Sequence, residues 1–140
     1  MDIIKEIKIK MVLTGYYAQV KKYKEKNLTL VNIALVKPEW FKESIENYPD
    51  LYPTREMLYD FNYSGDKDRY IQSYSEILYK LNPEKVFNDL NNKIILCYEK
   101  PTEFCHRHLV AIWLNQNGFS CREFNVSNQL HQPTWGYSFK

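Results

Sequence analysis

The chain has 140 residues, of which 44% are hydrophobic and 26% are charged, and its formal net charge is +2. This length suits one domain with a single core, and its four widely separated glycines exclude the G-x-G-x-x-G and Walker loops that hold dinucleotides or nucleoside triphosphates. The longest apolar runs, such as residues 109–114, fall far short of the roughly 20 residues that span a bilayer, and the first residues lack the apolar stretch of a signal peptide.

The first third of the chain predicts two strands and two short helical segments. Near the start of the chain, charged residues alternate with isoleucines, and an apolar run follows. This pattern predicts a strand near 7–13, which stops at Thr14-Gly15. A short basic helix or turn is expected over 16–26. Residues 28–36 are nearly all apolar or β-branched, which predicts a strand buried on both faces. Pro38 is expected to open a short helix, because proline is tolerated at the first helical position.

The middle of the chain predicts three helices. Thr54, Asp66 and Asn82 are suitable N-cap residues, and each precedes a segment with apolar residues at helical spacing. Pro83 further supports the start of the third helix, because proline is favoured at the first helical position. The expected core side chains of these helices are Met57, Leu58 and Phe61, then Tyr70, Tyr74, Ile77, Leu78 and Leu81, and finally Val86, Phe87 and Leu90.

The last third predicts a strand over 93–98, a helix from about 103 to 116 and a strand over 121–126. Thr102 is expected to cap this helix, and Asn117-Gly118 to end it. Strands that alternate with helices and are rich in branched apolar residues favour a mainly parallel sheet with helices on both faces. We therefore expect one small α/β domain over residues 1–126, flanked by a polar and aromatic tail over 127–140.

Composition gives weak evidence about partners. Twelve tyrosines are conspicuous, but tyrosine, lysine, asparagine and isoleucine share A/T-rich codons, so the number alone has no functional weight. Residues 1–26 carry seven lysines against three acids, which keeps nucleic acid open as a partner. Three cysteines are too few for a disulfide scaffold and fit a reducing compartment, so we expect a cytoplasmic protein without a membrane partner. Nothing in the sequence indicates the oligomeric state.

The segment from Cys97 to His108 concentrates reactive side chains, with two of the three cysteines, two of the three histidines and one of the four arginines. It lies where a buried strand passes into a helix, and ligand sites of open α/β sheets gather at the carboxyl ends of strands. The first turn of a helix attracts anions and favours the thiolate form of a cysteine. We therefore assign Cys105 as candidate nucleophile, His106 as candidate acid or base, and Arg107 as an anion-binding residue.

Other interpretations of the segment stay open. Cys105 can be a small buried hydrophobic residue, and Cys97 is expected to pack inside its strand. The cysteines and histidines offer four zinc ligands, but neighbouring residues on a helix diverge by about 100°, and no C-x-x-C pair is present, so we expect no metal and no cofactor. A phosphatase-type loop, with arginine six residues after Cys97, is absent because position 103 is glutamate.

Two stretches of this region resemble the signature of a prokaryotic family, the domain of unknown function four-eight-eight. They are Leu-Cys-Tyr-Glu-Lys over 96–100 and Phe-Cys-His-Arg-His-Leu-Val-Ala, followed by Trp-Leu, over 104–114. Further similarity lies in Thr14 to Ala18, Val31 to Phe41, Leu51 to Thr54 and the pair Tyr70 and Tyr74, so the resemblance covers about residues 8–126. Gly15 replaces a serine that family members often carry, which removes a hydroxyl group from this position.

The resemblance implies a Rossmann-like domain whose polar segments follow three predicted strands. Because the carboxyl ends of parallel strands share one edge of the sheet, these segments are expected to converge on one cleft. The residues that we assign to ligand binding there are Tyr16, Tyr17, Lys37, Tyr98, Lys100 and Arg107.

From these residues we hypothesise a small enzyme, a thiol- or acid/base-assisted transferase or hydrolase. Its substrate is expected to be anionic: a nucleotide, a nucleoside derivative or nucleic acid. Cys105 or Glu99 serves as nucleophile or general base with help from His106, while Tyr16 and Tyr17 stack on a ring of the substrate. The alternative is a non-catalytic nucleotide- or nucleic-acid-binding module that uses the same cleft. A third possibility is that the cluster only locks the third strand to its helix.

Overall fold

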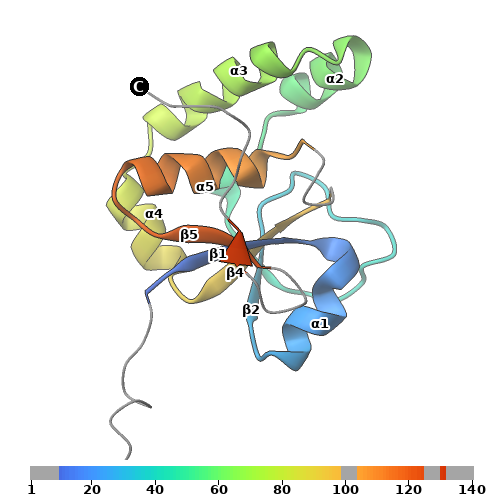
Figure 1. The fold of residues 1–140 in the computed structure, drawn as a ribbon. Helices are drawn as coiled ribbons and strands as arrows, with labels where there is room; N and C mark the ends of the chain where they lie inside the picture. Colours follow the sequence, from blue (N-terminus) through green and yellow to red (C-terminus); the bar gives the residue numbers. More distant parts are fainter. Residues whose placement is uncertain (1–9, 99–103, 125–129, 132–140) are drawn as a thin grey trace, which may run out of the picture.

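The computed structural model describes residues 10–98, 104–124 and 130–131. Its strands form one sheet in the order β3-β2-β4-β1-β5-β6 (Figure 1). The neighbouring strands from β3 to β5 pair in parallel, and β6 pairs antiparallel with β5. The strands are β1 (Val12–Tyr16), β2 (Thr29–Asn32), β3 (Glu46–Asn47), β4 (Lys93–Cys97), β5 (Cys121–Phe124) and β6 (Leu130–His131).

Helices cover both faces of the sheet. The α1 helix lies on one face, α4 and α5 lie on the other, and α2 and α3 form an outer layer over α5 (Figure 1). This arrangement confirms the predicted α/β fold with a mainly parallel sheet. The helices are α1 (Val20–Glu25), α2 (Arg55–Ser64), α3 (Lys67–Tyr79), α4 (Pro83–Leu90) and α5 (His106–Gln116), with short 3-10 turns at η2 (Tyr17–Gln19) and η3 (Pro49–Leu51).

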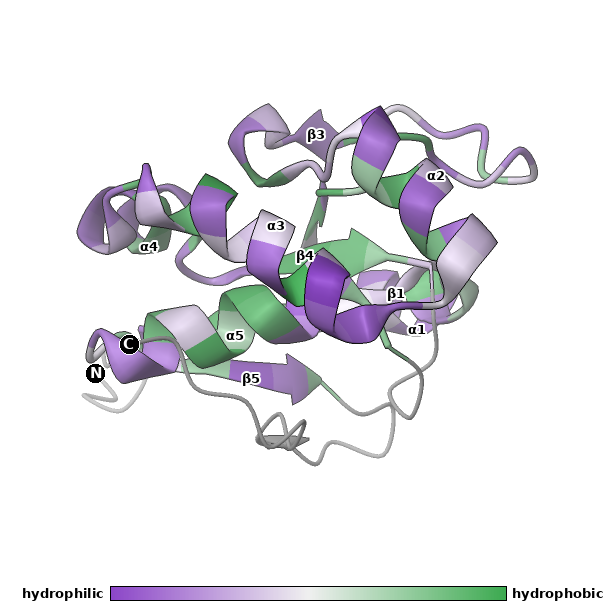
Figure 2. Ribbon diagram, turned by 90° about the horizontal axis from the view of Figure 1, so that it is seen from above, coloured by the Kyte–Doolittle hydropathy of each residue, from purple (hydrophilic) through white to green (hydrophobic). Residues whose placement is uncertain are grey.

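The central strand β4 separates two hydrophobic clusters. Ile95 belongs to the larger cluster under α3, α4 and α5, whereas Ile94 and Leu96 belong to the smaller cluster under α1. All three side chains are fully buried. Helix α5 is buried along 106–114, because the sheet lies on one side of it and α3 on the other. Figure 2 shows this contrast, with α5 mainly hydrophobic and α2 and α3 mainly hydrophilic.

The three helices of the middle begin at the predicted caps. The Thr54 hydroxyl accepts a hydrogen bond from the amide of Met57, and the Asp66 carboxylate accepts one from the amide of Arg69. Asn82 accepts from the amides of Glu84 and Lys85. Side-chain caps of this kind satisfy amides that have no partner within the helix. The predicted stripe on α3 is also confirmed, since Tyr70, Tyr74 and Leu78 are buried and Ile77 and Leu81 pack against them.

Several predicted boundaries are wrong. The first strand does not stop at Thr14-Gly15, because both residues belong to β1. The segment after Pro38 contains a turn rather than a helix, and it leads to the short edge strand β3. Helix α5 begins at His106, with Cys105 at the N-cap position, so Thr102 is not its cap.

Strand β2 is shorter than the predicted 28–36 because the side chain of Asn32 binds the backbone just beyond it. Its amide oxygen accepts from the Ala34 N–H at 3.1 Å, and its amide nitrogen donates to the Ala34 carbonyl at 2.9 Å. These bonds occupy the groups that a continued strand would need for its neighbour, and asparagine is typical of such turns. The chain is thereby turned away from the sheet at the edge where the site lies.

The end of the chain adds one further element to the sheet. The predicted tail over 127–140 contains β6, which lies beside β5. The remaining residues of that tail lie outside the described part of the chain. None of the helices in the described part of the chain is long and apolar enough to cross a membrane.

The absence of a side chain at Gly15 is a packing requirement. A Cβ atom there would lie 2.7 Å from Ile94 Cδ1 and 2.7 Å from the Tyr23 ring. We expect Gly15→Ala to lower the free energy of unfolding by about 1–3 kcal/mol, the usual cost of overpacking a core. Urea denaturation measures this loss. In the double variant with Ile94→Val, which removes Cδ1, the total loss should be smaller than the sum of the two single losses; simple additivity would contradict this account.

Candidate functional site

The carboxyl ends of the three central strands lie side by side, as expected for a parallel sheet. Tyr16 at the end of β1 pairs in register with Cys97 at the end of β4, and Asn32 at the end of β2 pairs with Leu96. The first residue of α5, His106, comes to the same edge. The amino-terminal end of a helix carries partial positive charge, so this edge favours a negative group.

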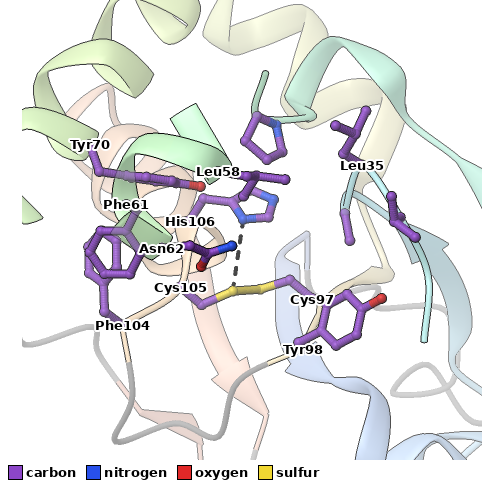
Figure 3. A pocket seen from close by; sticks show the side chains of 13 residues that line it. Leu35, Leu58, Phe61, Asn62, Tyr70, Cys97, Tyr98, Phe104, Cys105 and His106 are labelled. Carbon is purple, nitrogen blue, oxygen red and sulfur yellow. Dashed lines mark hydrogen bonds between the residues drawn. A yellow bond between two sulfur atoms is a disulfide. The ribbon is translucent and has the colours of Figure 1, made fainter. Parts of the chain in front are cut away.

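A cavity of about 290 Å³ opens at this edge, and its walls are mainly apolar and aromatic. Figure 3 shows the two sulfur atoms and the His106 ring facing the same space as the aromatic side chains. None of the described residues that line it carries a full charge at neutral pH. They are Ala34, Leu35, Val36, Pro53, Leu58, Phe61, Asn62, Tyr70, Cys97, Tyr98, Phe104, Cys105 and His106.

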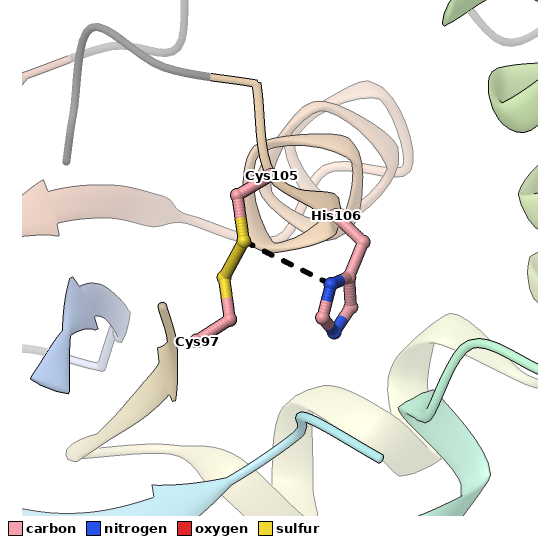
Figure 4. A group of neighbouring side chains, drawn as sticks. All are labelled: Cys97, Cys105 and His106. Atoms are coloured by element: carbon pink, nitrogen blue, oxygen red, sulfur yellow. Dashed lines mark hydrogen bonds between the residues drawn. A yellow bond between two sulfur atoms is a disulfide. The ribbon is translucent and has the colours of Figure 1, made fainter. Parts of the chain in front are cut away.

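The most reactive atoms of the cavity are two sulfurs, and the structure joins them as a disulfide between Cys97 and Cys105. Cys97 comes from the end of β4 and Cys105 from the start of α5 (Figure 4). This bond was not expected from the number of cysteines, and the expectation that Cys97 only packs inside its strand is also wrong. The third cysteine, Cys121, is free and buried in the main core.

The orientation of His106 is fixed by a single backbone contact. Its Nε2 atom lies 2.7 Å from the carbonyl oxygen of Ile33. A carbonyl only accepts hydrogen bonds, so Nε2 carries the proton of the neutral ring and Nδ1 carries the lone pair. Nδ1 lies 3.8 Å from the Cys105 sulfur. The imidazole therefore presents an acceptor to the sulfur of the neighbouring cysteine.

Both histidines of α5 are neutral at physiological pH. Burial, and to a lesser extent the nearby positive charge of Arg107, lower the pKa of His106 to about 4, although the hydrogen bond to Ile33 opposes this shift. Burial, followed by the charges of Arg107 and His106, lowers the pKa of His108 to about 3. A second positive charge beside Arg107 is thus strongly disfavoured.

Arg107 is fully buried and is held by a network from three strands. Its Nε and Nη2 atoms donate to the two carboxylate oxygens of Glu123, each at 3.0 Å, and Thr14 donates its hydroxyl to the same carboxylate. Nη1 donates to the Cys97 sulfur at 3.2 Å, and the Tyr16 ring covers the guanidinium at 5.6 Å. The sequence assigned Arg107 to substrate binding, but Glu123 occupies its bidentate side and Arg107 does not line the cavity.

Of the aromatic and cationic residues that were predicted to bind a ligand, some line the cavity and others do not. Tyr98 lines the cavity and is 43% exposed, whereas Tyr17 is buried and donates its hydroxyl to Asn32 at 2.6 Å. Tyr17 packs between Phe41 and Tyr98, so its ring supports the wall instead of standing free to stack. Lys37 directly follows the lining residue Val36 and lies 5.9 Å from the Phe41 ring. Glu99 and Lys100 lie outside the described residues.

Glu123, Thr14 and Asn32 were not expected in the site from the sequence. One signal for Glu123 was present, because side chains two apart on a strand share a face. Cys121 and Glu123 are both buried, and the residues after each of them are only partly buried. An acidic residue on the apolar face of a strand needs a buried partner, and arginine is the usual one.

Three ligand atoms for a soft metal ion also lie together. The sulfurs of Cys97 and Cys105 and a ring nitrogen of His106 are within 4.8 Å of one another. Side chains of neighbouring residues diverge within a helix, but Cys105 is the N-cap of α5 and has an extended backbone, so this divergence does not separate its sulfur from His106. The set suits zinc only when both thiols are reduced, since a disulfide sulfur is not a thiolate ligand.

Comparison with known families gives one match. The family model DUF488-N3a, described as the active DUF488-N3 subclade, matches residues 18–118. No curated protein and no solved structure matches the chain. The matched residues run from η2 to the turn after α5 and include both cysteines, His106 and Arg107, whereas Thr14 and Glu123 lie outside the match.

The neutral histidines predict that acid destabilises the fold. Below pH 6.5 the unfolded chain takes up a proton on each imidazole, while the folded chain does not until pH falls to about 4 at His106 and about 3 at His108. Stability is therefore lost as pH falls from 7 to 5, by about 2 kcal/mol for each imidazole. Urea unfolding at the two pH values measures the loss. The variant His106→Gln should lose about 2 kcal/mol less over this interval; an unchanged pH dependence would contradict the assignment.

The buried ion pair predicts a large cost when only one partner is removed. Arg107→Met leaves the Glu123 carboxylate buried without its cation, and we expect a loss of about 3–5 kcal/mol in urea unfolding. The double variant Arg107→Met with Glu123→Leu should recover most of that loss, because no charge is left uncompensated. Arg69→Ala is the matched control: it breaks a bidentate pair with Asp60 on the surface and should cost much less.

Proposed function

The chain belongs to the DUF488 family, and on this premise we propose that it is a cysteine-dependent enzyme acting on a nucleoside, a nucleotide or a related anionic compound. The description of its subclade as active supports an enzyme rather than a binding module. The geometry supports a transferase or hydrolase in which the reduced Cys97 is the nucleophile. The nucleophile is thus moved from Cys105, the residue that the sequence favoured.

The observation that carries this proposal is the hydrogen bond from Arg107 Nη1 to the Cys97 sulfur. An arginine N–H at 3.2 Å favours the thiolate, which is the nucleophilic form of cysteine. Cys97 also stands at the carboxyl end of the central strand, where α/β folds carry their sites, and opposite the start of α5. Arg107 lies ten positions after Cys97, whereas the arginine of a phosphatase-type motif lies six positions after its cysteine.

The cavity supports a planar, uncharged group next to the nucleophile. Phe61, Tyr70, Tyr98 and Phe104 supply aromatic surface, and Asn62 supplies an amide that donates and accepts hydrogen bonds. A volume of about 290 Å³ is at the small end of the range for ligand cavities, which suits a nucleobase or nucleoside. The anionic part of the substrate lies toward the rim in this proposal, where Lys37 follows Val36.

The reaction proceeds by nucleophilic displacement, with the Cys97 sulfur as the attacking atom. The Cys97 thiolate forms a bond to an electrophilic atom of the substrate while the bond to the leaving group breaks. Water or a second substrate then attacks the same atom and releases Cys97 as thiolate. His106 stays neutral and orients the attacking water or second substrate by accepting its hydrogen bond at Nδ1, because its tautomer leaves the lone pair on the side of the sulfurs. The proton that this nucleophile loses goes to the departed leaving group.

The experiment is a turnover assay of the reduced protein against free bases, nucleosides and nucleotides. Cys97→Ser is expected to lower kcat/KM by at least about 100-fold, because serine at this position lacks a base strong enough to ionise it. Cys105→Ser should keep most of the activity. Cys121→Ala is the matched control, since Cys121 pairs with Val12 at the opposite end of the sheet.

Two outcomes would contradict the proposal. Equal turnover by Cys97→Ser and the wild type would remove Cys97 from the chemistry. Tight binding of a nucleotide by calorimetry, without turnover of any member of the panel, would favour the non-catalytic module. In that case a steep fall of affinity with salt would indicate that phosphate contacts dominate.

A further inference from the structure

We infer that Cys97 is a site of oxidation by peroxides, and that Cys105 converts the oxidised Cys97 into the Cys97–Cys105 disulfide. The disulfide occupies the proposed nucleophile, so the enzyme is active only as the dithiol. This loss of activity rests on the proposed function, whereas the oxidation chemistry itself does not.

The two cysteines have different neighbours, which gives them different roles. Cys97 accepts a hydrogen bond from Arg107, and Cys105 lies next to the Nδ1 acceptor of His106. The thiolate at Cys97 is therefore the better target for an oxidant, and Cys105 is the thiol whose proton has a nearby acceptor. A reactive cysteine beside a second, resolving cysteine is the general arrangement of reversible thiol oxidation.

The position of the disulfide allows a small oxidant to reach it. Both cysteines are at least 95% buried, yet both line the cavity together with His106 (Figure 3). Hydrogen peroxide is little larger than water, so it fits easily in a space of about 290 Å³. Cys121, in contrast, does not line this cavity.

The chemistry balances with one peroxide for each disulfide. The Cys97 thiolate attacks one peroxide oxygen, the O–O bond breaks, and hydroxide leaves with a proton as water, which gives Cys97 sulfenic acid. The Cys105 thiol, oriented by His106 Nδ1, attacks the Cys97 sulfur. The S–O bond breaks, and the leaving hydroxide takes the proton of the Cys105 thiol to form a second water, while the imidazole stays neutral. An external dithiol later reduces the disulfide by two electrons.

The fold does not depend on this disulfide. It spans only eight residues, from the end of β4 to the start of α5. Helix α5 is already fixed by nine buried residues and by the Arg107–Glu123 pair, and β4 by parallel pairing with β1 and β2. The two cysteines form a small cluster with Ala34, apart from the main core. Opening the bond therefore leaves the surrounding elements in place.

The test treats the reduced full-length chain with equimolar hydrogen peroxide in the presence of EDTA, which removes metal ions as an alternative explanation. After unfolding in acid, free thiols are labelled and the intact mass is measured. The wild type should lose about 2 Da and keep one thiol, as a disulfide requires. Cys121→Ala should lose the same mass and keep none. In Cys105→Ala, which retains a small apolar side chain, Cys97 should instead form a dimedone adduct, the signature of sulfenic acid.

Three results overturn the inference: three free thiols in the treated wild type, a disulfide between two chains, or the same mass loss in Cys105→Ala. Melting curves of each variant establish that it is folded before treatment. The turnover assay then separates the two proposals. If peroxide forms the disulfide but Cys97→Ser keeps its activity, only the proposed function fails. If Cys97→Ser is inactive but no disulfide forms, only the oxidation fails.

Discussion

The buried ion pair between Arg107 and Glu123 is the constraint on which the site depends. A guanidinium that is removed from water needs a carboxylate with matching geometry, and Glu123 supplies both oxygens. The arginine comes from α5 and the glutamate from β5, so the pair forms only when the chain has returned from the helix to the sheet. Thr14 on β1 binds the same carboxylate. The orientation of α5, and with it the positions of Cys105 and His106, follows from this contact between neighbouring strands.

The same pair decides what kind of chemistry the edge of the sheet favours. Glu123 cancels the charge of Arg107 and occupies the two donors that a phosphate or carboxylate would use. Of the three remaining N–H groups, one is directed at the sulfur of Cys97. The described wall of the cavity is aromatic and uncharged, and both buried imidazoles are neutral. The site is therefore arranged around sulfur, whereas the sequence had suggested an anion clamp.

Local signals explain which parts of the fold could be predicted. The caps at Thr54, Asp66 and Asn82 act on amides within three residues, so the sequence indicates these helix starts directly. The end of β2 was missed because Asn32 was taken as one polar residue in an apolar strand, although its side chain turns the backbone. The contact between Cys97 and Arg107 depends on how the chain passes from β4 to α5. Residue spacing carries no such information, so the absence of a phosphatase-type six-residue offset did not exclude this contact.

The charge balance explains why a thiolate at Cys97 would remain reactive. An isolated arginine beside the sulfur would stabilise the thiolate strongly, and a strongly stabilised thiolate is a weaker nucleophile. Glu123 reduces this stabilisation without removing the directed N–H. With the ion pair neutral, a thiolate brings one net negative charge into a buried site, where the start of α5 is the main compensation. Reaction with an electrophile or closure of the disulfide removes that charge. Both processes thus relieve the same buried negative charge on Cys97, so the proposed nucleophile is also the residue that is oxidised.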